Sequence, residues 1–168
     1  MNNEFYILAK ERLGIIDGNY EIKSTFNGGN LIGLEYEPLY PQYGEILSPE
    51  EIGSPNIYKV ISGDFVSLKE GTGLVHIAPA FGEDDMAVGK KNNLPVILNI
   101  DEEGKFKPEV KNWAGMFVKA ADPLIIKDLK ERSILFKEEL YEHDYPFCWR
   151  CDSPLLYYAK KSWFIGMA

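Results

Sequence analysis

The stretch that governs the interpretation of this chain is GTGLVHIAPAFGEDD, from Gly71 to Asp85. Its apolar part, residues 74–78, has the composition of a buried strand, and it breaks at Pro79. Three carboxylates follow, and the run DDMAVGKKNN predicts a short helix that begins near Asp84. Acidic side chains in a first turn complement the positive end of a helix dipole. We therefore expect a strand that ends in a turn and leads into a helix.

The acidic cluster itself has two interpretations on composition alone. One is a solvated turn whose carboxylates cap the unpaired amides of the helix. The other is a cleft at the strand end, where Asp85 binds a cationic group of a substrate or orients a water molecule. His76 does not decide between them, because a single histidine on an apolar strand is usually a core residue.

Short apolar or alternating runs recur along the chain and predict further strands at residues 20–26, 57–68 and 94–100. The sequence DEEGKF, residues 101–106, predicts a turn in which Gly104 adopts a positive φ. The clearest helix is DPLIIKDLKERSIL, with Asp122 as its N-cap and Pro123 at its first position. We predict a mainly β fold, barrel-like, with flanking helices.

The composition of the sequence changes near residue 141, where aromatic residues become frequent. We therefore predict a core domain at residues 1–140 and a connecting segment at residues 141–168. The chain has 168 residues, of which 45% are hydrophobic, so it can bury one core of ordinary size.

Composition also limits the function classes. The net charge of −8 argues against a module that binds nucleic acid through its own electrostatic attraction, because phosphate contacts need basic side chains. No apolar run is long enough to cross a bilayer, and the N-terminus lacks the basic region of a secretory signal. We expect a cytoplasmic protein without a membrane partner.

Two cysteines, Cys148 and Cys151, form the motif CWRC. A structural zinc site needs four ligands, and this pair supplies two thiolates at the spacing such sites use. His143 is a candidate third ligand. The alternative is a reduced pair packed under the aromatic side chains. The chain shows no serine-protease-like triad spacing and no phosphate-binding loop.

Taken together, these stretches resemble the editing domain inserted in isoleucyl-tRNA synthetase, a class I aminoacyl-tRNA synthetase. The resemblance begins near residue 4 and continues to the end. Five blocks carry it in the family's order: LIGLEYEPLY, GTGLVHIAPAFGEDD, NNLPVILNIDEEGKF, WAGMFVKAADPLIIKDLKERSIL and YPFCWRCDSPLLYYAKKSWF. The related valyl and leucyl enzymes carry Pro-Ala-His-Asp where this chain has Pro79-Ala80-Phe81-Gly82. The resemblance implies a barrel-like fold of the valyl, isoleucyl and leucyl editing type.

The resemblance also implies an activity. The isoleucyl enzyme is itself the known example of a pocket that cannot reject a substrate smaller by one methylene, so a second, hydrolytic site removes valine from tRNA(Ile). Asp85 would be the catalytic residue, binding the α-ammonium group of the valyl ester and fixing the ester near a water molecule. His76 would exclude isoleucine by size. Four residues would complete the substrate site: Phe81 and Gly82 in its wall, and Ala78 and Pro79 at the strand end. Glu83 and Asp84 would cap the helix.

Other family features are missing. The His-Ile-Gly-His and Lys-Met-Ser-Lys-Ser signatures and the Thr-rich wall of the editing pocket do not occur, so we expect no synthesis and weak or no editing from these residues alone. Editing needs no cofactor. ATP and Mg²⁺ belong to the absent synthetic site, and Zn²⁺ to the parent, whose second CxxC would complete the site of Cys148 and Cys151.

The expected partners are valine-charged tRNA(Ile) and the remainder of the synthetase, with the chain itself monomeric. The alternative function is a non-catalytic module that docks tRNA or the rest of the synthetase. A stand-alone metal-dependent hydrolase lacks the necessary ligands.

Overall fold

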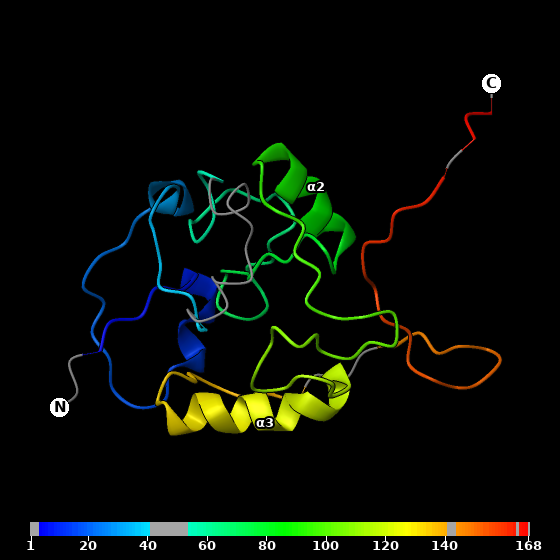
Figure 1. Cartoon of the computed structure of the whole chain (residues 1–168). Coiled ribbons are helices and arrows are strands. Elements are labelled where there is room, and N and C mark those ends of the chain that lie inside the picture. The colour runs from blue at the N-terminus through cyan, green and yellow to red at the C-terminus, as the bar shows by residue number, and fades with distance from the viewer. Residues whose placement is uncertain (1–3, 41–53, 141–143, 164, 168) are drawn as a thin grey trace.

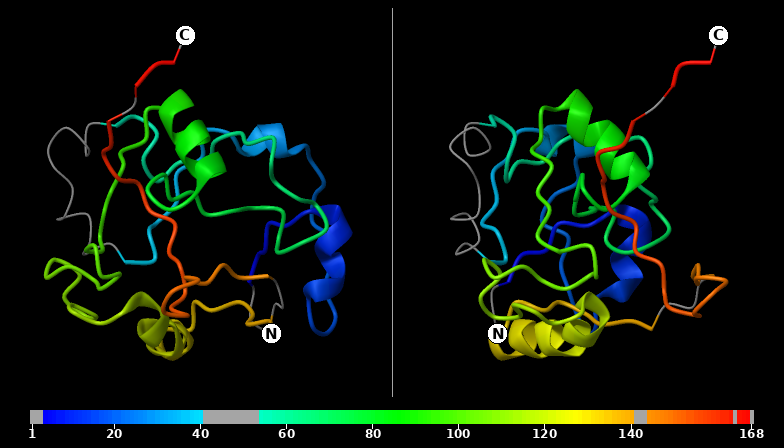
Figure 2. Two further views of the ribbon diagram at one scale, coloured as in Figure 1. Left: turned by 90° about the vertical axis from the view of Figure 1, so that its right-hand side faces the viewer. Right: turned by 45° about the vertical axis from the view of Figure 1, so that its right-hand side comes forward.

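The computed structural model describes residues 4–40, 54–140, 144–163 and 165–167. Within these ranges the regular elements are two 3₁₀ helices, η1 (Lys10–Ile15) and η2 (Gly28–Leu31), and two α-helices, α2 (Glu83–Lys91) and α3 (Val118–Glu131). Turns and extended backbone connect them. The views in Figures 1 and 2 place α2 and α3 at opposite ends of the molecule, and the last residues project past α2.

The predicted mainly β, barrel-like fold is wrong. The described residues form no sheet, and extended segments pair only through isolated bridges, at Glu35↔Lys59, Ile100↔Phe106, Lys105↔Phe117 and Phe147↔Pro154. An alternating pattern specifies an extended backbone, but a sheet also needs a neighbouring strand that continues the ladder of hydrogen bonds. The segments predicted as strands at residues 20–26 and 74–78 have no regular secondary structure and no such neighbour.

The predicted short helix after the signature is confirmed as α2. Its acidic side chains lie in the first turn and its basic residues, Lys90 and Lys91, in the last, so both ends complement the helix dipole. The helix ends at Lys91, and its C-cap is Asn92, whose side-chain amide donates to the carbonyl of Val88 at 2.9 Å. Asn93 then adopts a positive φ of 54°.

Helix α3 begins earlier than the sequence predicts. Its N-cap is Phe117, not Asp122, and Pro123 lies inside the helix. Proline removes a hydrogen bond there, since it has no N–H to donate to the preceding turn. The packing of Ala121, which is fully buried, explains the extra turn, because the side chain meets the core only if the helix already exists at that point.

The hydrophobic core lies against α3. Val110, Trp113 and Ala121 form its buried centre, with partly buried Tyr40, Phe106, Met116 and Ile125 packed around it. The ring of Tyr40 meets Trp113 edge-on at 5.1 Å between centroids. The Tyr40 hydroxyl donates to Asp128 at 2.9 Å, and the Arg132 guanidinium stacks over the Tyr40 ring at 4.9 Å. This arrangement attaches the chain near residue 40 to α3.

The predicted turn at residues 101–106 is confirmed. The amide of Asp101 donates to the carbonyl of Lys105 at 2.9 Å, and Gly104 has a φ of 72°. The carbonyl of Gly104 also accepts from the amide of Val118 at 3.0 Å, so this turn is fixed to the first residue of α3. The division of the chain near residue 140 stays a prediction.

Candidate functional site

The signature stretch is half-buried and not a core strand. Leu74 and Val75 are 44% and 53% exposed, and His76 is exposed as well. Burial begins at Pro79 and Ala80, where a turn closes through a hydrogen bond from the amide of Phe81 to the carbonyl of Ala78 at 2.9 Å. The buried part is therefore the turn that precedes α2.

Asp85 lies in the first turn of α2, and its side chain folds back over Gly82. A β-carbon placed on Gly82 would lie 3.0 Å from Cγ of Asp85, so glycine leaves the space that this carboxyl group occupies. The helix starts with a bond from the amide of Met86 to the carbonyl of Gly82 at 2.9 Å. The Asp85 side chain is half-buried. A carboxylate at this position is favoured by the positive end of the helix and remains able to accept hydrogen bonds from a ligand.

The structure brings most of the predicted site residues together in one turn-and-helix unit, namely Ala78, Pro79, Phe81, Gly82 and Asp85. His76 precedes this unit on exposed backbone and, among the described residues, makes no side-chain hydrogen bond. The roles assigned to these residues stay predictions.

Sequence reasoning missed Gly89, the residue through which α2 packs on the preceding turn. Gly89 is buried, and a β-carbon placed on it would lie 2.7 Å from Cγ of Pro79. Helix α2 therefore packs directly on the signature proline. A glycine in the middle of a helical run was the available signal, since glycine lowers helix stability and needs a packing reason to be there.

The end of α2 is held from another part of the chain. The side-chain amide of Asn56 donates to the carbonyl of Asn92 at 2.9 Å, and the hydroxyl of Ser54 donates to the carbonyl of Asn93 at 2.7 Å. The first bond satisfies the carbonyl of the C-cap, which a helix leaves without an internal partner, and the second holds the residue that follows it.

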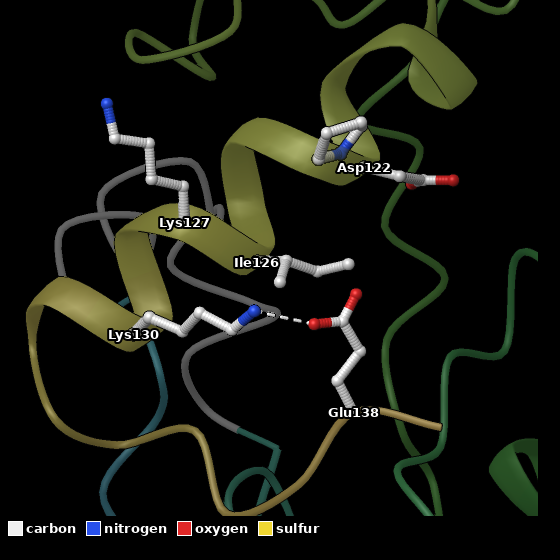
Figure 3. Close-up of a pocket in the computed structure, with 6 residues that line it drawn as sticks. Asp122, Ile126, Lys127, Lys130 and Glu138 are labelled. Carbon is white, nitrogen blue, oxygen red and sulfur yellow. Dashed lines mark hydrogen bonds and ion pairs between the residues drawn. The ribbon is translucent and has the colours of Figure 1, made fainter. Parts of the chain in front are cut away.

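A surface hollow of about 400 Å³ lies on α3, far from the signature. It is lined by Asp122, Pro123, Ile126, Lys127, Lys130 and Glu138. Figure 3 shows Lys130 and Glu138 pointing toward each other, with 2.6 Å between Nζ and Oε2, whereas Lys127 points away. None of the predicted site residues contributes to this hollow.

The cysteine motif forms a tight turn. The amide of Asp152 donates to the carbonyl of Cys148, and the amide of Cys148 donates to the carbonyl of Ser153, both at 2.9 Å. Cys148 is half-buried and Cys151 is exposed, and neither forms a disulfide. Hydrogen bonds from Ser153, first from its hydroxyl and then from its amide, lower the pKa of the Cys151 thiol below its ordinary value, with a smaller contribution from Cys148. Metal ligation requires the thiolate, so this turn suits it.

The zinc site predicted for the two cysteines stays a prediction, in which they supply two of the four ligands. Within the described ranges, no group of three or more histidine, cysteine or acidic side chains could hold a metal ion. His143, the predicted third ligand, lies outside the described residues. Among the described residues, the two cysteines are therefore not joined by a third candidate ligand.

Comparison with known proteins gives a consistent result along the whole chain. Isoleucine–tRNA ligases of Clostridium acetobutylicum and Clostridium tetani are 49% and 52% identical to it over 166 and 167 residues. The isoleucine–tRNA ligase of Tetrahymena thermophila is 44% identical over 173 aligned positions. These alignments cover 96–99% of this chain. The chain is homologous to a segment of isoleucine–tRNA ligase. No protein-family model matches it.

The predicted resemblance to the isoleucine–tRNA ligase family is therefore confirmed. The chain spans about 15% of the length of the curated relatives it matches. In the described part of the chain, no helix combines the length and apolar character needed to cross a membrane.

Proposed function

We propose that this segment is the editing part of an isoleucine–tRNA ligase and hydrolyses the ester between valine and tRNA(Ile). Its partners would be that mischarged tRNA and the remainder of the ligase, which would use ATP to attach isoleucine. The observation that carries the proposal is the position of Asp85, whose carboxyl group lies over Gly82 at the start of α2 in a segment homologous to this ligase family.

The chemistry follows from the charge of the substrate. An amino acid esterified to tRNA keeps a free α-ammonium group, and a carboxylate accepts charge-assisted hydrogen bonds from it. Asp85 would hold the ammonium group and thereby fix the ester carbonyl relative to an attacking water molecule. Such fixation converts an encounter with water into a reaction within a bound complex, so no covalent intermediate is needed.

Substrate selection would come from the residues around this carboxylate. Phe81 and Gly82 would form the wall beside the aliphatic side chain, with Ala78 and Pro79 keeping the turn in place. His76 would stand at the edge of the site and limit its size. A pocket that admits valine and excludes isoleucine needs to differ by the volume of only one methylene group.

The zinc ion that the family resemblance implies would not take part in this reaction. Cys148 and Cys151 would hold it with two further ligands from elsewhere in the ligase, and it would order the cysteine turn.

The first test replaces Asp85 in the full-length ligase. We expect Asp85→Ala to slow deacylation of valyl-tRNA(Ile) by about 10²–10³-fold, the cost typical of removing one preorganised electrostatic group, and Asp85→Asn to be similarly slow because it removes the charge. Isoleucine activation with ATP serves as the control and should not change. Deacylation at the wild-type rate by Asp85→Ala would remove this residue from the mechanism.

A docking role is the second candidate. Trp163, Ile165 and Met167 are 89–98% exposed, which favours burial of this end against the remainder of the ligase. The net charge of −8 gives no corresponding support to tight binding of bare tRNA.

A further inference from the structure

Residues 154–160 form an extended segment with two different sides. Pro154, Leu156 and Tyr158 are partly buried, whereas the alternate residues Leu155 and Tyr157 are 45% and 74% exposed. This alternation is the side-chain pattern of a strand, although no ladder forms here. In both views of Figure 2 the segment runs from the cysteine turn toward α2.

The segment is attached at three points. The side chain of Leu156 lies at Gly104, where an added β-carbon would be 2.5 Å from its Cδ1. The amide of Ala159 donates a hydrogen bond to the carbonyl of Ala80 at 2.6 Å. Next to it, the ammonium group of Lys160 lies 3.1 Å from a carboxylate oxygen of Glu102, a solvent-exposed ion pair that adds little.

The hydrogen bond from Ala159 to Ala80 connects the segment to the signature stretch, residues 71–85. Ala80 is only 3% exposed and lies in the turn between Ala78 and Phe81, directly before α2. A buried carbonyl that loses its partner is costly, so the donor from Ala159 favours one position of this turn over others. Since α2 starts at the end of the turn, that position also sets where Asp85 lies.

We infer that residues 154–160 are a strap that positions the signature turn, and through it Asp85, with the Ala159 amide as the positioning contact. The inference rests on the proposed editing function and deepens it. It joins the segment that carries the cysteine turn to the site of hydrolysis, and it assigns the strap no contact with the substrate.

The test uses the full-length ligase and removes only the donor. Ala159→Pro lacks the amide hydrogen, while Ala159→Ser keeps it and serves as the matched control. We expect Ala159→Pro to slow deacylation of valyl-tRNA(Ile) by about tenfold or more, as misplacement of a reacting group does. Ala159→Ser should stay close to the wild type, and isoleucine activation should be unchanged in both variants.

A double-mutant cycle with Asp85→Ala separates positioning from a general loss of structure. If the strap acts through Asp85, Ala159→Pro should cost much less once Asp85 is already alanine, so the two effects will not add. Full additivity would overturn the inference, as would wild-type deacylation by Ala159→Pro.

If Ala159→Pro also loses isoleucine activation, the variant has misfolded and Leu156→Ala decides instead. That change weakens the attachment at Gly104 and leaves the Ala159 amide in place. Slower deacylation with normal activation would support the strap, and an unchanged rate would overturn it. Absence of deacylation in the wild-type ligase would instead refute the proposed editing function.

Discussion

The two α-helices lie at opposite ends of the molecule, and their surroundings differ. Around α3, Trp113 and Ala121 are buried and aromatic rings pack on one another. Around α2, the turn at Pro79 and Ala80 is buried, but Asp85 is half-buried and the preceding apolar residues are exposed. Apolar burial, the main source of stability, is thus concentrated at α3, while the candidate chemistry is at α2.

This separation has a physical reason. A carboxylate that binds a substrate cation must stay reachable, and burying it without a partner would be costly. The α2 end is therefore held by close local contacts, namely the Pro79 ring against Gly89 and the backbone hydrogen bond from Ala159 to Ala80, more than by large apolar side chains. Substitutions near α3 should consequently change the free energy of unfolding, whereas substitutions near α2 should change the rate of deacylation.

The largest effect is expected at the α3 end. Trp113→Ala removes the largest buried side chain of the core cluster and should lower the free energy of unfolding of this chain by about 3–5 kcal/mol. Urea unfolding followed by circular dichroism measures the loss. If the variant is already unfolded without urea, Trp113→Phe gives a smaller, measurable loss.

The control for this change is Trp163→Ala, since Trp163 is 98% exposed. It should leave the unfolding midpoint of the isolated chain where it is. Equal losses from the two tryptophans would show that the core is not confined to the α3 end.

An intermediate effect, on chemistry and not on stability, is expected from Gly82→Ala in the full-length ligase. The new β-carbon would take the space of the Asp85 carboxyl group, which is free to rotate away, and the φ of −150° at Gly82 is open to alanine. Deacylation of valyl-tRNA(Ile) should slow by about ten- to a hundredfold, because a shift of about 1 Å in a reacting group has such a cost.

Gly28→Ala is the matched control, because nothing lies within 4 Å of the position its β-carbon would take. It should not alter deacylation. If Gly82→Ala instead lowers the thermal unfolding midpoint and leaves the rate of deacylation unchanged, the α2 end would be contributing to stability and not to chemistry. That result would contradict the contrast between the two ends.

The smallest effect concerns Cys151, which belongs to neither end. A lowered thiol pKa means that the thiolate is present at lower pH than for an ordinary cysteine, so alkylation by iodoacetamide should begin at lower pH. Ser153→Ala removes the largest cause of this lowering. The pKa of the Cys151 thiol should therefore rise, so that alkylation begins at higher pH. The profile is best measured in Cys148→Ser backgrounds, where Cys151 is the single thiol. Identical profiles with and without Ser153 would rule out this hydrogen bond as the cause.

The sequence predicted local structure better than long-range structure. Helix α2 and the turn at Gly104 follow from neighbouring residues, through charge at the helix ends and the conformational freedom of glycine. The start of α3 was misplaced because burial of Ala121 outweighs the preference of Pro123 for a first turn. The predicted barrel failed for a related reason, since alternation cannot specify a pairing partner.

The same limit applies to the candidate site. The quoted signature was sufficient to bring Pro79, Gly82 and Asp85 into one unit, because they are close in the sequence. It gave no sign of Ala159, whose contribution is a backbone amide that any residue except proline would provide. Contacts of this kind between distant backbone groups leave no pattern of side chains to detect.

The three tryptophans of the chain occupy three different places: Trp113 in the core, Trp149 within the cysteine turn and Trp163 near the C-terminus. Their fluorescence would therefore respond to three separate events. Unfolding would shift the emission of Trp113 to longer wavelength, occupation of the cysteine turn would change that of Trp149, and assembly with the rest of the ligase would protect Trp163 from a soluble quencher. Variants retaining one tryptophan each would report these events without an added dye.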